Sequence, residues 1–148
     1  KMMSHVTTID IDIHDLDALA IAAGDCGCTL NLGQQTYRWY GTHVGDFPLP
    51  QGFKSEDMGH CEHAITSNDN SQAYEVGVVK RRDGQAGWTL IYDFWAGGYG
   101  MSEVVGGRCE RLKQAYATEV ARKQMRKQGW NVKRKTESGV VVLTCSKM

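Results

Sequence analysis

The chain has 148 residues, of which 41% are apolar and 23% are charged, and 17 basic residues balance 17 acidic ones. This length is typical of one domain, and the composition excludes disorder as the default state. No apolar run approaches the roughly 20 residues of a membrane-spanning helix. The opening stretch KMMSHVTT lacks the apolar core of a signal peptide. We therefore expect a cytoplasmic protein without a membrane anchor.

The predicted elements of the first part are a strand, a short helix and a hairpin. In HVTTIDIDIHD three isoleucines alternate with polar residues, which is typical of a half-buried strand. DLDALAIAAGDCG predicts a short helix that Asp15 caps and Gly24 ends. CTLNLG and QTYRWYG predict a hairpin. Residues 41–59 lack periodicity and hold both prolines of the chain, so we expect a long irregular loop there.

Strands dominate the middle of the chain. HCEHAIT predicts one strand, and AYEVGVVKRRDG and GWTLIYDFWAGG predict two more around a turn at Asp83–Gly84. The following residues, Ser102–Gln128, predict the one long helix, which could restart after Gly106–Gly107. Its predicted buried stripe consists of Cys109, Leu112, Tyr116 and Val120. WNVKRKTE and GVVVLTCS then predict a closing hairpin that turns at Ser138–Gly139.

This order of elements predicts an α+β fold in a single domain that covers residues 2–148. Few helices and many sequential hairpins favour a mainly antiparallel sheet of about six to eight strands. One short and one long helix should cover one face of that sheet.

The charges of the chain are distributed unevenly. Residues 101–148 hold eleven basic and four acidic residues, which gives this segment a net charge of +7, whereas the first hundred residues carry −7. Two such halves can attract each other within one fold. They can also present surfaces of opposite sign to partners.

Two short stretches, DCGC and HCEH, supply four soft-metal ligands: Cys26, Cys28, Cys61 and His63. Zinc takes four such ligands in a tetrahedron, usually with two to four residues between paired ligands, and CGC leaves only one. The chain has five cysteines, an odd number that indicates reduced thiols. We favour the interpretation without a metal, in which Cys61 and Ile65 face the core on the same side of a strand as His63, whose ring hydrogen-bonds to a loop.

The glycine-rich stretch WAGGYGMS leads from a strand towards a helix, and a turn of this kind offers backbone N–H groups to an anion. This stretch is neither GxGxxG nor a P-loop, so its glycines could simply permit the turn while its serine caps the helix. If a ligand does bind here, we expect its contacts from Trp95, Gly97, Gly98, Gly100, Ser102 and, nearby, His63.

Residues 108–135 are rich in bases that could meet nucleic-acid phosphates, with a tryptophan that could stack on a base. The competing interpretation is a solvated helix face, because lysine and arginine are good helix formers. The residues of this candidate surface are Arg122, Lys123, Arg126, Lys127, Trp130, Lys133 and Arg134.

Catalysis has the weakest support in the sequence. The chain contains no GxSxG and no HExxH motif, and no histidine has a visible nucleophile partner. Asp10, Asp12 and Asp93 would have to converge on one sheet face to make a carboxylate cluster. We therefore expect neither an enzyme nor a cofactor.

Several stretches together resemble one known family. They are MSHVTTIDIDIHDLDALAIA, CEHAI, YEVGVV, YDFW and RLKQAYATEVARKQMRKQGW, which span nearly the whole chain. The chain resembles the family named hypothetical chloroplast reading frame thirty-five, small domains of unknown function in plastids, cyanobacteria, other bacteria and phages. The resemblance implies an intracellular domain without a membrane segment and supplies no activity. It also implies a structural or ligand-facing role for His63 rather than zinc binding. THVGDFPLPQGFKSEDMG departs from the family pattern.

These observations favour a non-enzymatic binding or accessory protein of phage or bacterial origin that contacts a protein partner through its acidic sheet face or its basic helix. A homodimer that pairs the −7 and +7 regions is one concrete form. Two alternatives stay open at this point. The first is nucleic-acid binding through residues 108–135, and the second is nucleotide or anion binding through residues 96–102.

Overall fold

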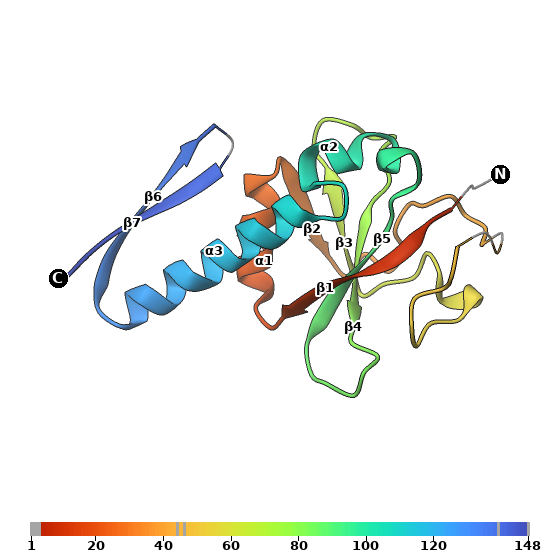
Figure 1. Ribbon diagram of the computed structural model, residues 1–148, viewed down its shortest axis with the longest axis horizontal. Helices are drawn as coiled ribbons and strands as arrows, with labels where there is room; N and C mark the ends of the chain where they lie inside the picture. The colour runs from red at the N-terminus through yellow and green to blue at the C-terminus, as the bar shows by residue number, and fades with distance from the viewer. Residues whose placement is uncertain (1–3, 44, 46, 139, 148) are drawn as a thin grey trace.

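The computed structural model describes residues 4–43, 45, 47–138 and 140–147, and its centre is a five-stranded sheet (Figure 1). Each pair of neighbouring strands is antiparallel. The order across the sheet is β1-β5-β4-β3-β2. The strands are β1 (Val6–Ile13), β2 (Cys28–Leu32), β3 (His63–Ser67), β4 (Val76–Lys80) and β5 (Trp88–Asp93).

The remaining elements complete an α+β fold, as predicted from the sequence. A short and a long helix, α1 and α3, lie on one face of the main sheet, and a second, two-stranded sheet follows them (Figure 1). The helices are α1 (Leu16–Asp25), α2 (Met101–Val105) and α3 (Glu110–Lys127), with two 3₁₀ segments, η1 (Ser55–Asp57) and η2 (Trp95–Gly100). The second sheet pairs β6 (Trp130–Glu137) with β7 (Val140–Lys147).

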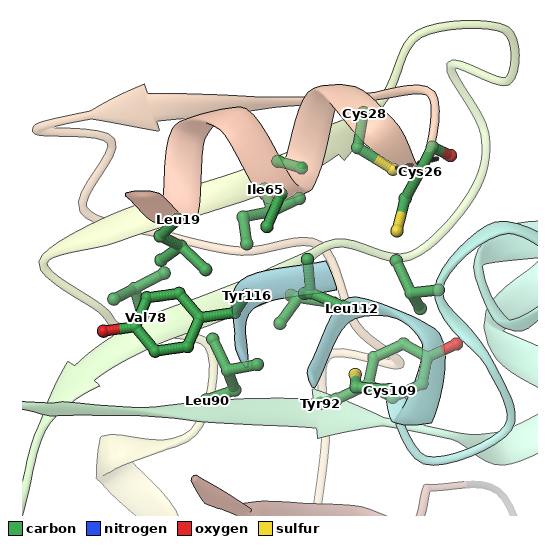
Figure 2. Packing of buried hydrophobic residues seen from close by; sticks show 14 of the residues in the cluster. Leu19, Cys26, Cys28, Ile65, Val78, Leu90, Tyr92, Cys109, Leu112 and Tyr116 are labelled. Atoms are coloured by element: carbon green, nitrogen blue, oxygen red, sulfur yellow. Dashed lines mark hydrogen bonds between the residues drawn. The ribbon is translucent and has the colours of Figure 1, made fainter. Parts of the chain in front are cut away.

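The main core lies between the helices and the sheet (Figure 2). Its largest fully buried side chains include Leu19 from α1, Leu112 from α3, and Ile65 and Leu90 from the sheet. Burying a side chain of this size stabilises the fold by about 1.5–3 kcal/mol. The predicted cap of α1 forms, because the Asp15 carboxylate accepts the Ala18 N–H at 2.9 Å.

The opposite face of the sheet is covered by irregular chain rather than by helices. The side chains of Tyr37, Phe53, Met58 and Cys61 pack there against strand residues. The predicted hairpin of CTLNLG with QTYRWYG is wrong, because β2 pairs with β3, and the β-pairing of residues 35–41 is limited to an isolated bridge between Thr36 and His60. The alternation of aromatic residues in QTYRWYG therefore reflects core filling rather than a strand.

A glycine makes this covering possible. Gly77 lies in β4 directly beneath the Tyr37 ring, and a Cβ atom there would come within 2.7 Å of the ring. Tyr37 is 3% exposed, so its ring fills the space that a side chain at position 77 would need.

The predicted long helix is interrupted where its glycines indicated. α2 ends at Val105 and α3 begins at Glu110, and Gly106 between them has a φ of 100°. The predicted buried stripe is wrong at one position. Val120 is 39% exposed and lines a groove of about 740 Å³ beside the β1–α1 corner, whereas Glu119 is buried. Burial of Glu119 is tolerated because Arg122 pairs with it at 2.5 Å.

A buried carboxylate joins three distant segments. Asp93, at the end of β5, is fully buried, and its Oδ1 accepts the N–H groups of His5 at 2.9 Å and Trp95 at 3.1 Å. Its Oδ2 accepts the Tyr40 N–H at 3.1 Å. Hydrogen bonds to a buried charged group are among the stronger ones in proteins. Asp93 therefore fixes the start of β1, the covering segment and the turn after β5 to one another.

We expect Asp93→Ala to lower the free energy of unfolding by about 2–4 kcal/mol, because it leaves one buried and two partly buried N–H groups without their acceptor. Asp93→Asn should cost less, since one acceptor oxygen remains. Urea unfolding followed by circular dichroism measures both effects. Asp10→Ala is the matched control, because Asp10 is exposed and should change stability by less than about 0.5 kcal/mol. Equal stability of the Asp93→Ala and Asp10→Ala variants would contradict this role.

Candidate protein-interaction surface

The predicted anion-binding turn is occupied by its own internal contacts. Residues 96–99 all have positive φ angles, between 51° and 63°, and form a left-handed turn. The Gly98 carbonyl accepts the Tyr74 N–H at 2.8 Å. The Ser102 hydroxyl bonds to the Tyr92 hydroxyl at 2.7 Å, and Gly100 rather than Ser102 occupies the N-cap position of α2. A Cβ atom on Gly98 would overlap the Tyr92 hydroxyl, so this glycine is needed for the close approach.

His63 does not lie near that turn. It opens β3 opposite Val78, and its Nδ1 accepts the Gly33 N–H at 2.9 Å. Its ring centroid is 6.0 Å from that of Trp88, which begins β5, whereas the turn follows the end of β5. The expectation that His63 and the turn form one site is therefore wrong, because the length of a strand separates them.

The four soft-metal candidates do not converge either. Cys26 and Cys28 lie in the core on the helix side of the sheet, together with Cys109 (Figure 2). Cys61 lies in the cluster on the opposite face, so the predicted common side of Cys61 and His63 is wrong. Within residues 4–43, 45, 47–138 and 140–147, no group of three or more His, Cys, Asp or Glu side chains is placed to hold a metal.

Burial also makes the core thiols poor nucleophiles. It raises the pKa of Cys28 to about 12, and it raises the pKa of Cys61 to about 12 as well. Burial likewise raises the pKa of Cys109, whose side chain is fully buried. At neutral pH these groups stay protonated, and a thiol reacts as its thiolate. They act as small apolar side chains in the core.

Three residues of the predicted nucleic-acid surface are engaged in ion pairs within the chain. Arg122 pairs with Glu119, Lys123 with Asp15 and Arg134 with Asp25, each at 2.5 Å. The last two pairs join the basic C-terminal part to the acidic first hundred residues. Trp130 is half-buried, and Lys147 lies over its ring at 5.0 Å. The cations left exposed are Arg126, Lys127 and Lys133.

The three carboxylates that would have to converge for a catalytic cluster, Asp10, Asp12 and Asp93, do not do so. Asp10 and Asp12 are exposed on the second half of β1, whereas Asp93 is buried beside the beginning of β1, where its backbone pairs with Val6. Asp12 is held in an ion pair with Arg81 at 2.7 Å. The three carboxylates therefore serve separate roles.

The C-terminal hairpin stands apart from the main sheet. It lies against α3 at the end of the molecule away from β1–β5 (Figure 1). Strand alternation turns Val132, Val141, Leu143 and Cys145 towards α3, where they are half-buried. Sulfur atoms meet at this contact, since Cys145 Sγ lies 3.5 Å from Met125 Sδ. We call residues 117–138 and 140–147 the C-terminal arm.

The outer face and the edges of this hairpin are open. Val140 is 55% exposed and borders a pocket beside α3, whereas Val142 is 38% exposed on the face opposite to that of Val141 and Leu143. Among the described residues, no further strand pairs with either β6 or β7. An edge strand exposes a row of backbone N–H and C=O groups, and natural proteins usually protect it with charges. β6 carries four charged residues, whereas the β7 run VVVLTCS carries none.

Sequence reasoning predicted this hairpin and assigned Trp130, Lys133 and Arg134 of its first strand to a nucleic-acid surface, but it assigned no role to the second strand. The uncharged run in β7 was a visible signal. Whether another strand covers that run depends on the pairing of all the strands, which a single sequence does not reveal. The open edge of β7 therefore becomes recognisable only in the folded chain.

Comparison of the chain with protein-family models, curated proteins and solved structures gives no match. The resemblance to the chloroplast reading-frame family therefore stays a prediction. In the part of the chain that the structure describes, no helix combines the length and apolar character needed to cross a bilayer.

We expect a maleimide reagent at about pH 8 to modify Cys145 first, because it is the one cysteine that is not fully buried. Cys26, Cys28, Cys61 and Cys109 should react at least about tenfold more slowly until urea unfolds the chain. Peptide mapping by mass spectrometry after timed labelling measures the rates. Rapid labelling of Cys28 or Cys109 in the folded protein would contradict the structure.

The pKa of Asp15 lies below its usual value near 4, mainly because the Lys123 ammonium group donates a hydrogen bond to its carboxylate. The contribution of this pair to stability is present above that pH and is lost as the pH falls through the lowered pKa. Lys123→Met should therefore make unfolding less sensitive to acid than in the wild type. Urea midpoints at about pH 6 and pH 3 measure the difference. Lys127→Met, which removes an exposed lysine outside this pair, is the control and should keep the wild-type pH dependence.

Proposed function

We propose that the chain is a non-enzymatic binding protein that recognises another protein chain through its C-terminal arm. One observation carries this proposal: the arm ends in a two-stranded sheet whose β7 edge is unpaired and uncharged. A strand in this condition is a template for a further strand. Main-chain hydrogen bonds would then supply affinity, and the side chains on alternate positions would supply specificity.

The energetics of the hairpin support this proposal. A two-stranded hairpin is marginally stable in water without further strands or packing. Here the packing is partial, because the side chains towards α3 are half-buried and those on the other face are exposed. A third strand would satisfy the open backbone groups and would cover part of Val140 and Val142. Association at this edge therefore stabilises the arm and the complex together.

The same geometry favours a protein partner over nucleic acid. Three bases of the arm form ion pairs with carboxylates of the same chain: Arg122, Lys123 and Arg134. Nucleic-acid affinity depends on the number of cations that can replace counterions at the phosphates. The remaining exposed cations on the arm serve equally well as solubilising groups around an apolar edge.

The arm is suited to binding rather than to chemistry. Its acid–base groups are paired, as in Arg122 with Glu119, or exposed at its surface. Cys145 lies against Met125, and no cation is paired with its sulfur among the described residues. Nucleophilic catalysis needs a nucleophile beside a base, and this surface does not provide such a pair.

A photo-crosslinking amino acid in place of Thr144, on the exposed face of β7, tests the proposal in cells that produce the protein naturally. We expect a protein adduct of defined mass after irradiation, because position 144 borders the open edge. The control is the same amino acid in place of Glu56, which is exposed in η1 far from the arm. A nucleic-acid adduct at position 144, or equal protein adducts at both positions, would overturn the proposal.

A further inference from the structure

We infer that the arm's partner is a second copy of the same chain, joined by antiparallel pairing of the two β7 strands about a two-fold axis at Leu143. This inference rests on the proposed function, because it takes the arm as the binding surface. It adds the identity of the partner and the register of the contact.

The register of the hairpin shows which backbone groups are available. Glu137 pairs with Val140 across a two-residue turn, so this closing pair exchanges both of its hydrogen bonds. Hydrogen-bonded and non-bonded pairs alternate along an antiparallel ladder. The backbone groups of Val141, Leu143 and Cys145 therefore point away from β6, towards the open edge.

These three residues are complementary to themselves. With Leu143 of one copy opposite Leu143 of the other, Val141 lies opposite Cys145, and each pair can exchange two hydrogen bonds. The two-fold axis repeats the same contact on both sides, which is the isologous form of a dimer. On the outer face this register places Val142 opposite Thr144.

The charge pattern is what favours a second copy as the occupant. In a sheet ordered β6-β7-β7-β6, the uncharged strands of the two copies are central and the charged strands are outermost. Lys133 and Lys135 then protect both remaining edges, which is a usual defence of edge strands against further pairing. No like charges lie opposite each other within residues 140–146, although the hairpin as a whole is basic.

Charge attraction between the acidic and basic halves is not required for this dimer. Asp15 and Asp25 are already paired with Lys123 and Arg134 of their own copy. The dimer expected from the sequence, in which the −7 and +7 regions meet, would have to compete with these pairs. Pairing at β7 leaves them intact.

A charge-swap series on the full-length chain tests the inference, with sedimentation equilibrium as the measurement. The variant V142K/T144K places lysine opposite lysine twice, and V142E/T144E places glutamate opposite glutamate twice. We expect each to raise the dimer dissociation constant at least about tenfold over the wild type. V142K/T144E places opposite charges across the axis and should stay dimeric.

The mixed sample provides the sharpest control. V142K/T144K and V142E/T144E, each monomeric alone, should form a heterodimer when combined, because lysine then lies opposite glutamate at every such position. Recovery of the dimer also shows that both variants are folded. Within one hairpin, positions 142 and 144 lie opposite Lys135 and Lys133, so V142E/T144E should keep the wild-type circular dichroism, whereas V142K/T144K should lose part of its strand signal alone and regain it in the mixture.

Three outcomes would overturn the inference. They are a monomeric wild type at all concentrations up to about 1 mM, a V142K/T144K variant that stays dimeric, and a mixture that fails to recover the dimer. The proposed function fails separately. If the wild type is monomeric and position 144 crosslinks to a different protein, the binding role is supported and the self-association is excluded. If position 144 gives no protein adduct, both proposals are excluded.

Discussion

The hydroxyl group of Tyr116 joins the two parts of this molecule. It accepts the backbone N–H groups of His14 at 3.1 Å and Asp15 at 3.3 Å, at the corner where β1 gives way to α1. The ring of Tyr116 is in the main core, so one side chain anchors α3 by both apolar packing and hydrogen bonding. The C-terminal arm follows Tyr116 directly, so this contact helps to fix its orientation relative to the main sheet.

Ion pairs extend the anchoring along the arm. Two turns after Tyr116, Lys123 reaches Asp15, and the hairpin returns to α1 through Arg134 and Asp25. Exposed pairs of this kind contribute little stability each. Their effect here is positional, because they join the acidic and basic halves of the sequence within one copy. Part of the opposite charge of the two halves is thus neutralised by ion pairs inside the fold.

Local pattern was sufficient to predict many of the elements. The alternation of isoleucines placed β1, the capping aspartate placed α1, and the glycines at 106 and 107 placed the break before α3. Long-range partners were not predictable in this way. From the sequence alone, Glu119 is expected at the surface, but its ion pair with Arg122 allows it to be buried. Tyr37 is expected in a strand, but its ring packs over Gly77 from an irregular segment.

The candidate surface had the same limitation. Its residues were part of a predicted hairpin, but their importance depends on which neighbouring strands are present. The resemblance to a family favoured a role for His63, and the glycine pattern favoured the turn at residues 96–102, but both make hydrogen bonds within the chain. An uncharged strand has functional meaning only when its edge is open, and openness is a property of the whole topology.

The position of the hairpin at the end of the molecule has a consequence for valency. α3 has 18 residues and is a stiff rod of roughly 27 Å, whose first half packs in the main core and whose second half leads to the hairpin. Two copies that meet at β7 would hold their five-stranded sheets apart, one at each end of an elongated particle. Any weak contact made by one sheet would then be repeated by the other, and avidity would replace affinity in capturing a repetitive target.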